Sequence, residues 1–277
     1  MKKGRSIIGV FLFLIIGIIL VVGLLTVIFQ FDSPKDEETT EIIKEPIHLV
    51  ALGDSLTEGV GDTTNSGGYV PIVANLLEET DNYKEVTTSN YGKSGDRSDQ
   101  ILEHFYENKA IQEDIEAADI VVLTVGGNDI IQTFKQNFLT VAEESFVGPK
   151  ETYEENLRTL FTAIEEVNPK VELYVFGIYN PYSVYFPEIT EMQTIVDEWN
   201  KTTQEVVNET KNADFISIAD LFNQTLIQDE KEDLLIDETD PNETEVKNPY
   251  LYEEDLFHPN EAGYELMGNA LFQVIEK

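Results

Sequence analysis

The sequence predicts an α/β protein in which helices cover both faces of a parallel β-sheet. Segments that read as strands alternate along the chain with segments whose apolar residues recur at helical spacing. The strand segments are apolar along most of their length, as is typical of parallel strands that are buried on both faces. These two observations predict a three-layer α/β/α sandwich.

The N-terminal segment predicts a membrane anchor. Residues 7–29 form an uncharged apolar run of 23 residues, just after three basic residues. A helix of this length can cross a hydrocarbon core of about 30 Å. A cleaved signal peptide would have a shorter apolar region that ends at small residues, which this run lacks. We therefore predict an uncleaved single-pass anchor in the cell membrane, with residues 1–6 in the cytoplasm and the remainder extracellular.

Residues 30–45 are acidic and without periodicity, so we expect a flexible stalk before a folded domain over residues 46–277. The chain carries 53 acidic against 18 basic residues, and this negative field makes nucleic acid an unfavourable partner. It has no cysteine, which excludes disulfides and thiolate metal sites and fits a bacterial surface protein.

The folded domain is expected to contain alternating strands and helices. The predicted strands are Ile47–Leu52, Lys84–Asn90, Ile120–Val125, Val171–Gly177 and Phe215–Ile218. The predicted helices are Tyr69–Glu79, Asp99–Asn108, Tyr153–Val167, Thr190–Thr210 and Glu261–Ile275. Asn168-Pro169 ends the third helix, because the residue before a proline disfavours helical geometry. Residues 228–249 are acidic and lack calcium-ligand spacing, so a solvated loop is expected there.

The first strand leads directly into a candidate nucleophile. Its apolar run stops at Gly53, and Asp54 and Ser55 follow at the carboxyl end of the strand, where ligands bind in open α/β sheets. Gly53 and Gly59 permit a sharp exit that turns Ser55 outward. The same residues also suit an ordinary turn, so a catalytic role requires a base and oxyanion donors elsewhere in the chain.

Three histidines are available as the base. His48 begins the first strand, at the end away from Ser55, and His104 lies within a helix beside charged residues. His258 precedes the last helix and follows Asp255 by three positions, so that one tight turn places both side chains on the same side. Asp255 could then orient the imidazole of His258, as a catalytic triad requires.

Two further stretches follow the second and third strands. Asn90–Asp96 contains Gly95, and Val125–Asp129 contains Asn128. A glycine backbone N–H and an asparagine amide near strand ends are suitable oxyanion donors. Each stretch is also an ordinary turn sequence, because Gly and Asn favour positive φ.

These blocks occur in one order, and together they resemble a known family. Gly53-Asp-Ser-Leu56, Gly95, Gly126-Gly-Asn128-Asp and Asp255-x-x-His258 resemble the SGNH (GDSL-type) hydrolases, a family of lipases, esterases and acylhydrolases. The blocks span residues 53–258, essentially the whole predicted domain. The resemblance implies a flavodoxin-like three-layer fold with a five-stranded parallel sheet, and neither a metal nor an organic cofactor.

The resemblance also implies site residues and a reaction. Ser55 would be the nucleophile, His258 the general base and Asp255 its orienting partner. The oxyanion hole would comprise the backbone N–H groups of Ser55 and Gly95 and the side chain of Asn128. The implied reaction is hydrolysis of carboxylic esters through an acyl-enzyme.

The substrate is less defined by the sequence. The aromatic stretch Ile178–Pro187 leaves the fourth strand at the same sheet edge, so Tyr182 and Phe186 are candidates for substrate binding, although ordinary loop packing explains them equally. An extracellular site favours lipid, cell-wall or small exported esters. A polysaccharide O-acyl esterase or acyltransferase would use the same residues. A non-catalytic binding protein would be expected to lack a triad residue, and none is missing.

Overall fold

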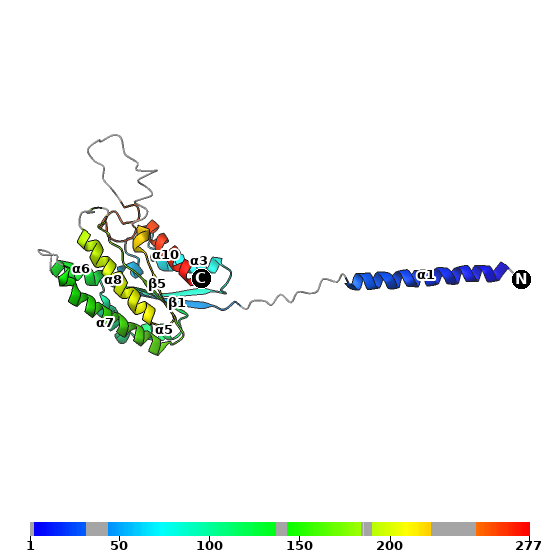
Figure 1. The fold of residues 1–277 in the computed structure, drawn as a ribbon, viewed down its shortest axis with the longest axis horizontal. Helices are drawn as coiled ribbons and strands as arrows, with labels where there is room; N and C mark the ends of the chain where they lie inside the picture. Colours follow the sequence, from blue (N-terminus) through cyan, green and yellow to red (C-terminus); the bar gives the residue numbers. More distant parts are fainter. Residues whose placement is uncertain (1–2, 32–43, 137–142, 184, 186–189, 223–247) are drawn as a thin grey trace, which may run out of the picture. The chain divides into compact units, whose positions relative to one another are not determined.

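The computed structural model describes residues 3–31, 44–136, 143–183, 185, 190–222 and 248–277. The chain divides into two compact units, Met1–Ile43 and Lys44–Lys277. The first contains helix α1 (Lys3–Phe31) (Figure 1). Within the described part of the chain, no helix is both long enough and apolar enough to span a membrane, so the predicted anchor over residues 7–29 is not confirmed. Most of the predicted stalk falls outside the described residues.

The second unit is built on a parallel sheet. Its strands are β1 (Ile47–Gly53), β2 (Val86–Gly92), β3 (Ile120–Thr124), β4 (Glu172–Phe176) and β5 (Ala213–Ile216). They form a five-stranded sheet in the order β2-β1-β3-β4-β5, and every neighbouring pair is parallel. This confirms the predicted five-stranded parallel sheet.

The register of the sheet aligns the ends of three strands. Gly53, the last residue of β1, pairs with Gly92 at the end of β2 and with Thr124 at the end of β3. The segments that follow these strands therefore leave the sheet at the same edge. Ligands of open α/β sheets bind at such an edge, where the chain order reverses between neighbouring strands.

Helices cover both faces of the sheet. They are α2 (Ser55–Glu58), α3 (Tyr69–Glu79), α4 (Ser98–Glu107), α5 (Lys109–Glu116), α6 (Gly127–Gln136), α7 (Glu144–Val167), α8 (Thr190–Glu209) and α10 (Glu261–Ile275). Two clusters of buried apolar side chains form the core, one containing residues of α3 and α10 and the other residues of α4 to α8. Figure 1 shows α3 and α10 on one side of the sheet and α7 on the other.

Alternate residues of the central strands supply these two clusters. Val50 and Leu52 belong to the cluster with α4 to α8, whereas Leu49 and Ala51 belong to the cluster with α3 and α10. Every residue of β3 is buried. The apolar runs therefore arise because both faces of each central strand are covered, as the sequence indicates.

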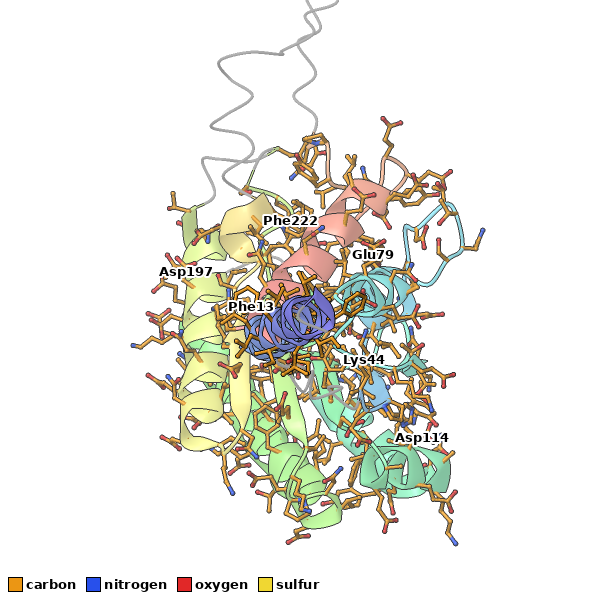
Figure 2. All side chains as sticks on the ribbon, turned by 90° about the vertical axis from the view of Figure 1, so that its right-hand side faces the viewer. Phe13, Lys44, Glu79, Asp114, Asp197 and Phe222 are labelled. Atoms are coloured by element: carbon orange, nitrogen blue, oxygen red, sulfur yellow. The ribbon has the colours of Figure 1, made fainter. Side chains whose placement is uncertain are left out.

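Apart from buried carboxylates such as those of Asp54 and Asp96, charged side chains lie on the outside of this unit. Glu79 on α3 and Asp197 on α8 are exposed, whereas Phe222 is buried (Figure 2). The acidic composition thus places charge in contact with water, where ionised groups carry little desolvation cost.

Four helical segments differ from the sequence-based prediction. α2, α5 and α6 were not expected, and α7 begins at Glu144 rather than Tyr153. α7 contains Pro149, which predicts a break, but Phe146 on the same helix is buried and packs edge-on to Trp199 with ring centroids 6.5 Å apart. Burial of this aromatic side chain offsets the helix-breaking effect of the proline. The acidic stretch 228–249 falls almost entirely outside the described residues.

Candidate active site

The turn after β1 holds Ser55 at the first position of a one-turn helix. Asp54 caps this helix, and its carboxylate accepts the backbone N–H of Leu56 at 3.0 Å. Gly59 ends the helix with φ of 90°, in the left-handed region that glycine adopts readily. The turn therefore places the Ser55 hydroxyl at the N-terminal end of a helix, where backbone N–H groups have no partner within the helix itself.

The structure brings Ser55, His258 and Asp255 together. Ser55 Oγ lies 2.9 Å from His258 Nε2, although the two residues are 203 positions apart in the chain. The other ring nitrogen, Nδ1, lies 2.6 Å from Asp255 Oδ2. With the proton on Nδ1, the ring donates to the carboxylate and accepts from the serine hydroxyl. This is the arrangement that a serine nucleophile with a general base requires.

The carboxylate of Asp255 is fixed by the turn that also carries His258. Its Oδ1 accepts the backbone N–H groups of Phe257 at 2.9 Å and His258 at 3.0 Å. Partial burial alone would raise the pKa of Asp255, but the hydrogen bonds from the His258 ring and from these backbone groups outweigh it and lower the pKa below its ordinary value. Asp255 is therefore ionised at neutral pH and can stabilise a protonated imidazole.

The turn itself is anchored to the domain. Leu256 adopts a left-handed conformation with φ of 55°, and Tyr252 and His258 are joined by a backbone hydrogen bond of 2.8 Å. The hydroxyl of Tyr179 donates to the carbonyl of Phe257 at 2.7 Å. These bonds limit the positions that the His258 ring can take.

The other two histidines lie elsewhere. His48 Nε2 is 3.0 Å from Ser89 Oγ, and His104 Nε2 is 2.9 Å from Asp96 Oδ2. Neither forms a hydrogen bond with Ser55 among the contacts of the described residues.

Asn128 lies on the same edge as Ser55, at the start of α6. Both residues line one cavity at the carboxyl ends of β1 and β3. The amide Nδ2 of Asn128 donates to the carbonyl of Asp96 at 2.9 Å. Gly95, with φ of 85°, precedes that carbonyl in the loop after β2, but it is not among the residues that line the cavity. The loop of Gly95 and the side chain of Asn128 are thus joined directly.

A buried polar network lies behind the Ser55 turn. The hydroxyl of Thr124 donates to Asp54 Oδ1 at 2.8 Å and lies 2.8 Å from the hydroxyl of Thr57. Thr57 in turn lies 2.9 Å from the hydroxyl of Tyr69. Burial raises the pKa of Asp54 against the opposing hydrogen bonds from Thr124 and Leu56. No motif in the sequence indicates this network, although Thr124 is the polar residue that ends an apolar strand.

A second cavity adjoins the first. It encloses about 290 Å³, and the two cavities share Gly127, Ile178, Tyr179, Pro181 and Phe257. The lining of the second is largely apolar and includes Ile130, Ile131, Phe134, Tyr182, Met192 and Val196. Tyr182 therefore lies at a cavity next to Ser55, whereas Phe186 falls outside the described residues.

Most of these apolar lining residues were not predicted from the sequence. The spacing of Ile130, Ile131 and Phe134 is helical and could have indicated a helix with an apolar side. Phe257 stands between Asp255 and His258, so its place at the site follows from theirs. Among the residues that the structure describes, no group of three or more His, Cys, Asp or Glu side chains could hold a metal ion.

Comparisons with known proteins identify the family of this chain. A sequence profile of the GDSL-like lipase/acylhydrolase family matches residues 51–266. The Bacillus subtilis (strain 168) protein YpmR is 36% identical over 234 residues, which cover 84% of this chain and 83% of that protein. The spore germination lipase LipC of Bacillus licheniformis is 27% identical over 229 residues, which cover 81% of this chain and 94% of LipC.

Solved structures share the fold. The lipase Lip_vut3 from a goat rumen metagenome superposes with a TM-score of 0.65 at 24% identity and covers 81% of this chain and 95% of its own. The acetylxylan esterase Axe2 from Geobacillus stearothermophilus has a TM-score of 0.58 at 22% identity and covers 85% of this chain and 96% of its own. At these identities the likeness concerns the fold.

Proposed function

Because the chain belongs to the GDSL-like lipase/acylhydrolase family, we propose that it hydrolyses carboxylic esters with Ser55 as the nucleophile. His258 is the general base, and Asp255 orients its ring and stabilises the imidazolium. The observation that carries this proposal is the chain of contacts from Ser55 Oγ to His258 Nε2 at 2.9 Å and from His258 Nδ1 to Asp255 at 2.6 Å.

In the first half of the reaction, Ser55 Oγ attacks the carbonyl carbon of the ester while His258 Nε2 takes its proton. The carbonyl oxygen becomes an oxyanion, which accepts hydrogen bonds from the backbone N–H groups of Ser55 and Gly95 and from the amide of Asn128. The tetrahedral intermediate then collapses. The alcohol leaves with the proton from His258, and the acyl group stays on Ser55.

In the second half, water takes the place of the alcohol. His258 removes a proton from the water as its oxygen attacks the acyl carbon, and the same donors hold the second oxyanion. Collapse of this intermediate releases the carboxylic acid and returns the proton to Ser55 Oγ.

The adjoining cavity supports an ester whose acyl chain is longer than acetyl. It is lined mainly by apolar side chains and shares lining residues with the cavity that Ser55 lines. An alkyl chain placed there loses contact with water, which contributes about 0.8 kcal/mol per buried methylene. We therefore assign this cavity to the acyl chain and call it the acyl cavity.

The proposal is tested by ester hydrolysis with the purified full-length chain. We expect hydrolysis of p-nitrophenyl acetate, butyrate, octanoate and laurate, with the octanoate or laurate ester preferred over the acetate. Ser55→Ala should abolish hydrolysis and covalent labelling by a fluorophosphonate. Ser89→Ala is the matched control, because Ser89 also contacts a histidine but lies away from the site. Labelling that persists in Ser55→Ala contradicts the assignment of the nucleophile.

We also propose that the enzyme acts outside the cell membrane, on lipid, cell-wall or small exported esters. The support is the uncharged run 7–29 that follows Lys2, Lys3 and Arg5. Large apolar side chains of α1, such as that of Phe13, are exposed in the structure. The test is cell fractionation followed by protease treatment of intact cells without their wall. Protein recovered in the soluble fraction, or protected from protease, contradicts this location.

A further inference from the structure

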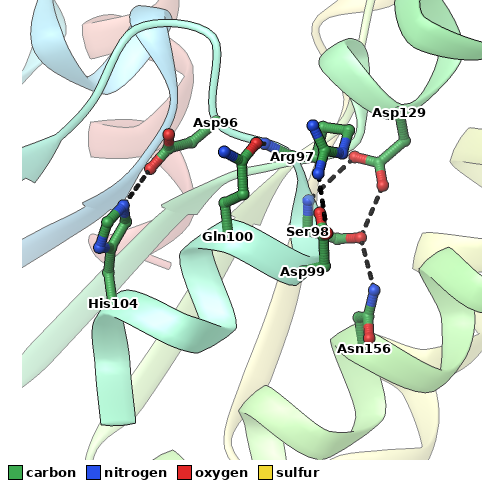
Figure 3. Close-up of polar contacts among 8 residues, drawn as sticks. All are labelled: Asp96, Arg97, Ser98, Asp99, Gln100, His104, Asp129 and Asn156. Atoms are coloured by element: carbon green, nitrogen blue, oxygen red, sulfur yellow. Dashed lines mark hydrogen bonds and ion pairs between the residues drawn. The ribbon is translucent and has the colours of Figure 1, made fainter. Parts of the chain in front are cut away.

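The carboxylate of Asp129 joins the loop of Gly95 to the helix of Asn128. Ser98, the first residue of α4, donates its backbone N–H to Asp129 Oδ2 at 3.0 Å and its hydroxyl to Oδ1 at 2.6 Å (Figure 3). Asp129 lies in the first turn of α6, directly after Asn128. Both oxygens of one carboxylate therefore hold the end of the loop that follows β2.

This contact is built into the domain and not a surface pairing. Ser98 is 2% exposed, and the Nδ2 of Asn156 on α7 donates to its hydroxyl at 3.0 Å. Burial raises the pKa of Asp129, while the hydrogen bonds from Ser98 oppose that shift. The N–H of Ser98 is one of the donors that α4 leaves unpaired in its first turn, and an acceptor carboxylate is favourable at a helix N-terminus.

A second bond connects the same two segments nearer to Ser55. The Nδ2 of Asn128 donates to the carbonyl of Asp96 at 2.9 Å. A side-chain amide carries two N–H groups, so one can serve the carbonyl of Asp96 while the other is directed at an oxyanion. The direction of the second N–H depends on where the loop places Asp96. The position of the loop depends in turn on the two hydrogen bonds that Asp129 accepts from Ser98.

We propose that Asp129 is a positioning residue of the oxyanion hole. It fixes the loop 93–98 against α6, so that the N–H of Gly95 and the amide of Asn128 point to one place. Asp129 acts through Ser98 and Asp96, and contacts neither Ser55 nor the ester. The inference rests on the proposed esterase function, because an oxyanion hole has meaning only where a carbonyl is attacked.

The first test is Asp129→Asn. This change preserves size but removes the charge and replaces one acceptor oxygen with an NH₂ donor, so the bond with the Ser98 hydroxyl must reverse its direction or be lost. Misplacement of catalytic groups by about 1 Å can cost a factor of about 100 in rate. We expect kcat to fall about 10- to 100-fold with KM and the unfolding temperature close to those of the wild type. Ser98→Ala, which removes only the hydroxyl, should give a smaller decrease in kcat.

The matched control is Asp119→Asn. Asp119 accepts the backbone N–H of His48 at 2.8 Å, at the amino end of the sheet, so the same chemical change is made far from Ser55. We expect kcat to be unchanged in this variant. A full kcat in Asp129→Asn overturns the inference, as does an equal decrease in kcat in the Asp119→Asn control.

A double-mutant cycle separates positioning from a purely structural role. If Asp129 acts through the oxyanion hole, its substitution should lower kcat by a smaller factor once Asn128→Ala has already removed the amide. The combined loss in kcat should therefore be smaller than the product of the two single losses. Losses that multiply overturn the inference. If Asp129→Asn does not fold, the cycle of Ser98→Ala with Asn128→Ala gives the same decision.

The same experiments distinguish failure of the proposed function from failure of the inference. If the wild-type chain shows no Ser55-dependent ester hydrolysis, both the proposed function and the inference are contradicted. If the wild type is active and Asp129→Asn has an unchanged kcat, only the inference is contradicted.

Discussion

The hydroxyl of Thr124, at the end of β3, donates to the carboxylate of Asp54 at 2.8 Å. The same hydroxyl accepts the backbone N–H of Asp54 at 3.2 Å. Two neighbouring strands are thereby joined at the turn that carries Ser55. Both residues are buried, and Asp54 is 4% exposed. Ser55 therefore lies on a turn whose polar groups are paired inside the protein.

Thr124→Val tests the contribution of this pair to stability. Valine keeps the shape of threonine but removes the donor to Asp54 and the acceptor of its N–H. A buried polar group that loses its partner costs about 1–3 kcal/mol, so we expect the free energy of unfolding to fall by that amount. Chemical denaturation measures the change.

A matched control is Thr162→Val. Thr162 donates to the carbonyl of Arg158 on an exposed side of α7, so its hydroxyl has water as an alternative partner. Surface changes of this kind usually alter stability by less than about 0.5 kcal/mol. Equal effects of the two substitutions would contradict the role assigned to Thr124.

The pKa of Asp255 predicts how stability depends on pH. The folded state lowers this pKa, so the ionised carboxylate stabilises the fold, and the stabilisation is complete above the unfolded pKa of about 3.9. It is lost as pH falls through the still lower folded pKa. Asp255→Asn removes the titrating group. We therefore expect the difference in unfolding temperature between wild type and variant to be constant near neutral pH and to shrink below about pH 4.

The measurement is thermal unfolding of both proteins across that range. Asp197→Asn serves as the control, because Asp197 is an exposed carboxylate of α8 away from Ser55. A difference between wild type and Asp255→Asn that grows as the pH falls would contradict the direction of the pKa shift.

Much of the fold could be predicted because buried strands and helices have recognisable patterns of apolar residues. β1 and β3 read as continuous apolar runs since both of their faces are covered. Gly126-Gly-Asn128-Asp129, by contrast, reads as a turn, yet α6 starts within it at Gly127. Residues that favour turns also favour helix starts, so local composition does not separate the two.

The site could be predicted only in part. Ser55, Asp255 and His258 belong to recognisable short motifs, and the strand order places those motifs at one edge. The contact between Asp129 and Ser98 has no such motif, because it joins side chains 31 positions apart. The acyl cavity is likewise assembled from α6, α8 and the segment after β4, and its shape depends on how these elements pack.

Filling the acyl cavity should change the preferred ester. Ile131 on α6 lines this cavity and is partly exposed, so Ile131→Trp adds volume there without entering the fully buried core. We expect KM for p-nitrophenyl octanoate to rise at least about 10-fold, because pocket contacts worth 1–3 kcal/mol are removed, while hydrolysis of the acetate is retained. Steady-state kinetics on both esters measure the change.

Val147→Trp is the control for the added indole, because Val147 is exposed on α7 and lines a different cavity. Fluorophosphonate labelling of Ser55 should persist in both variants. Equal losses on octanoate and acetate in Ile131→Trp would show that the substituted side chain disturbs the site in general, and would contradict the assignment of the acyl cavity.

Two glycines should respond differently to the same substitution. Gly59 ends α2 with φ of 90°, and a Cβ there would lie 2.7 Å from the backbone of Gly67. Gly59→Ala should therefore lower the unfolding temperature and displace the turn that carries Ser55, with a cost above about 1 kcal/mol. Gly148 lies within α7 just before Pro149, and a Cβ there meets nothing within 4 Å apart from its chain neighbours. Alanine is favoured over glycine in a helix by about 1 kcal/mol, but the ring of Pro149 disfavours a Cβ on the residue before it, so Gly148→Ala should change the unfolding temperature little and leave kcat unchanged. Thermal unfolding and ester hydrolysis of the two variants measure both effects, and a stable, fully active Gly59→Ala would contradict the backbone geometry assigned to the nucleophile turn.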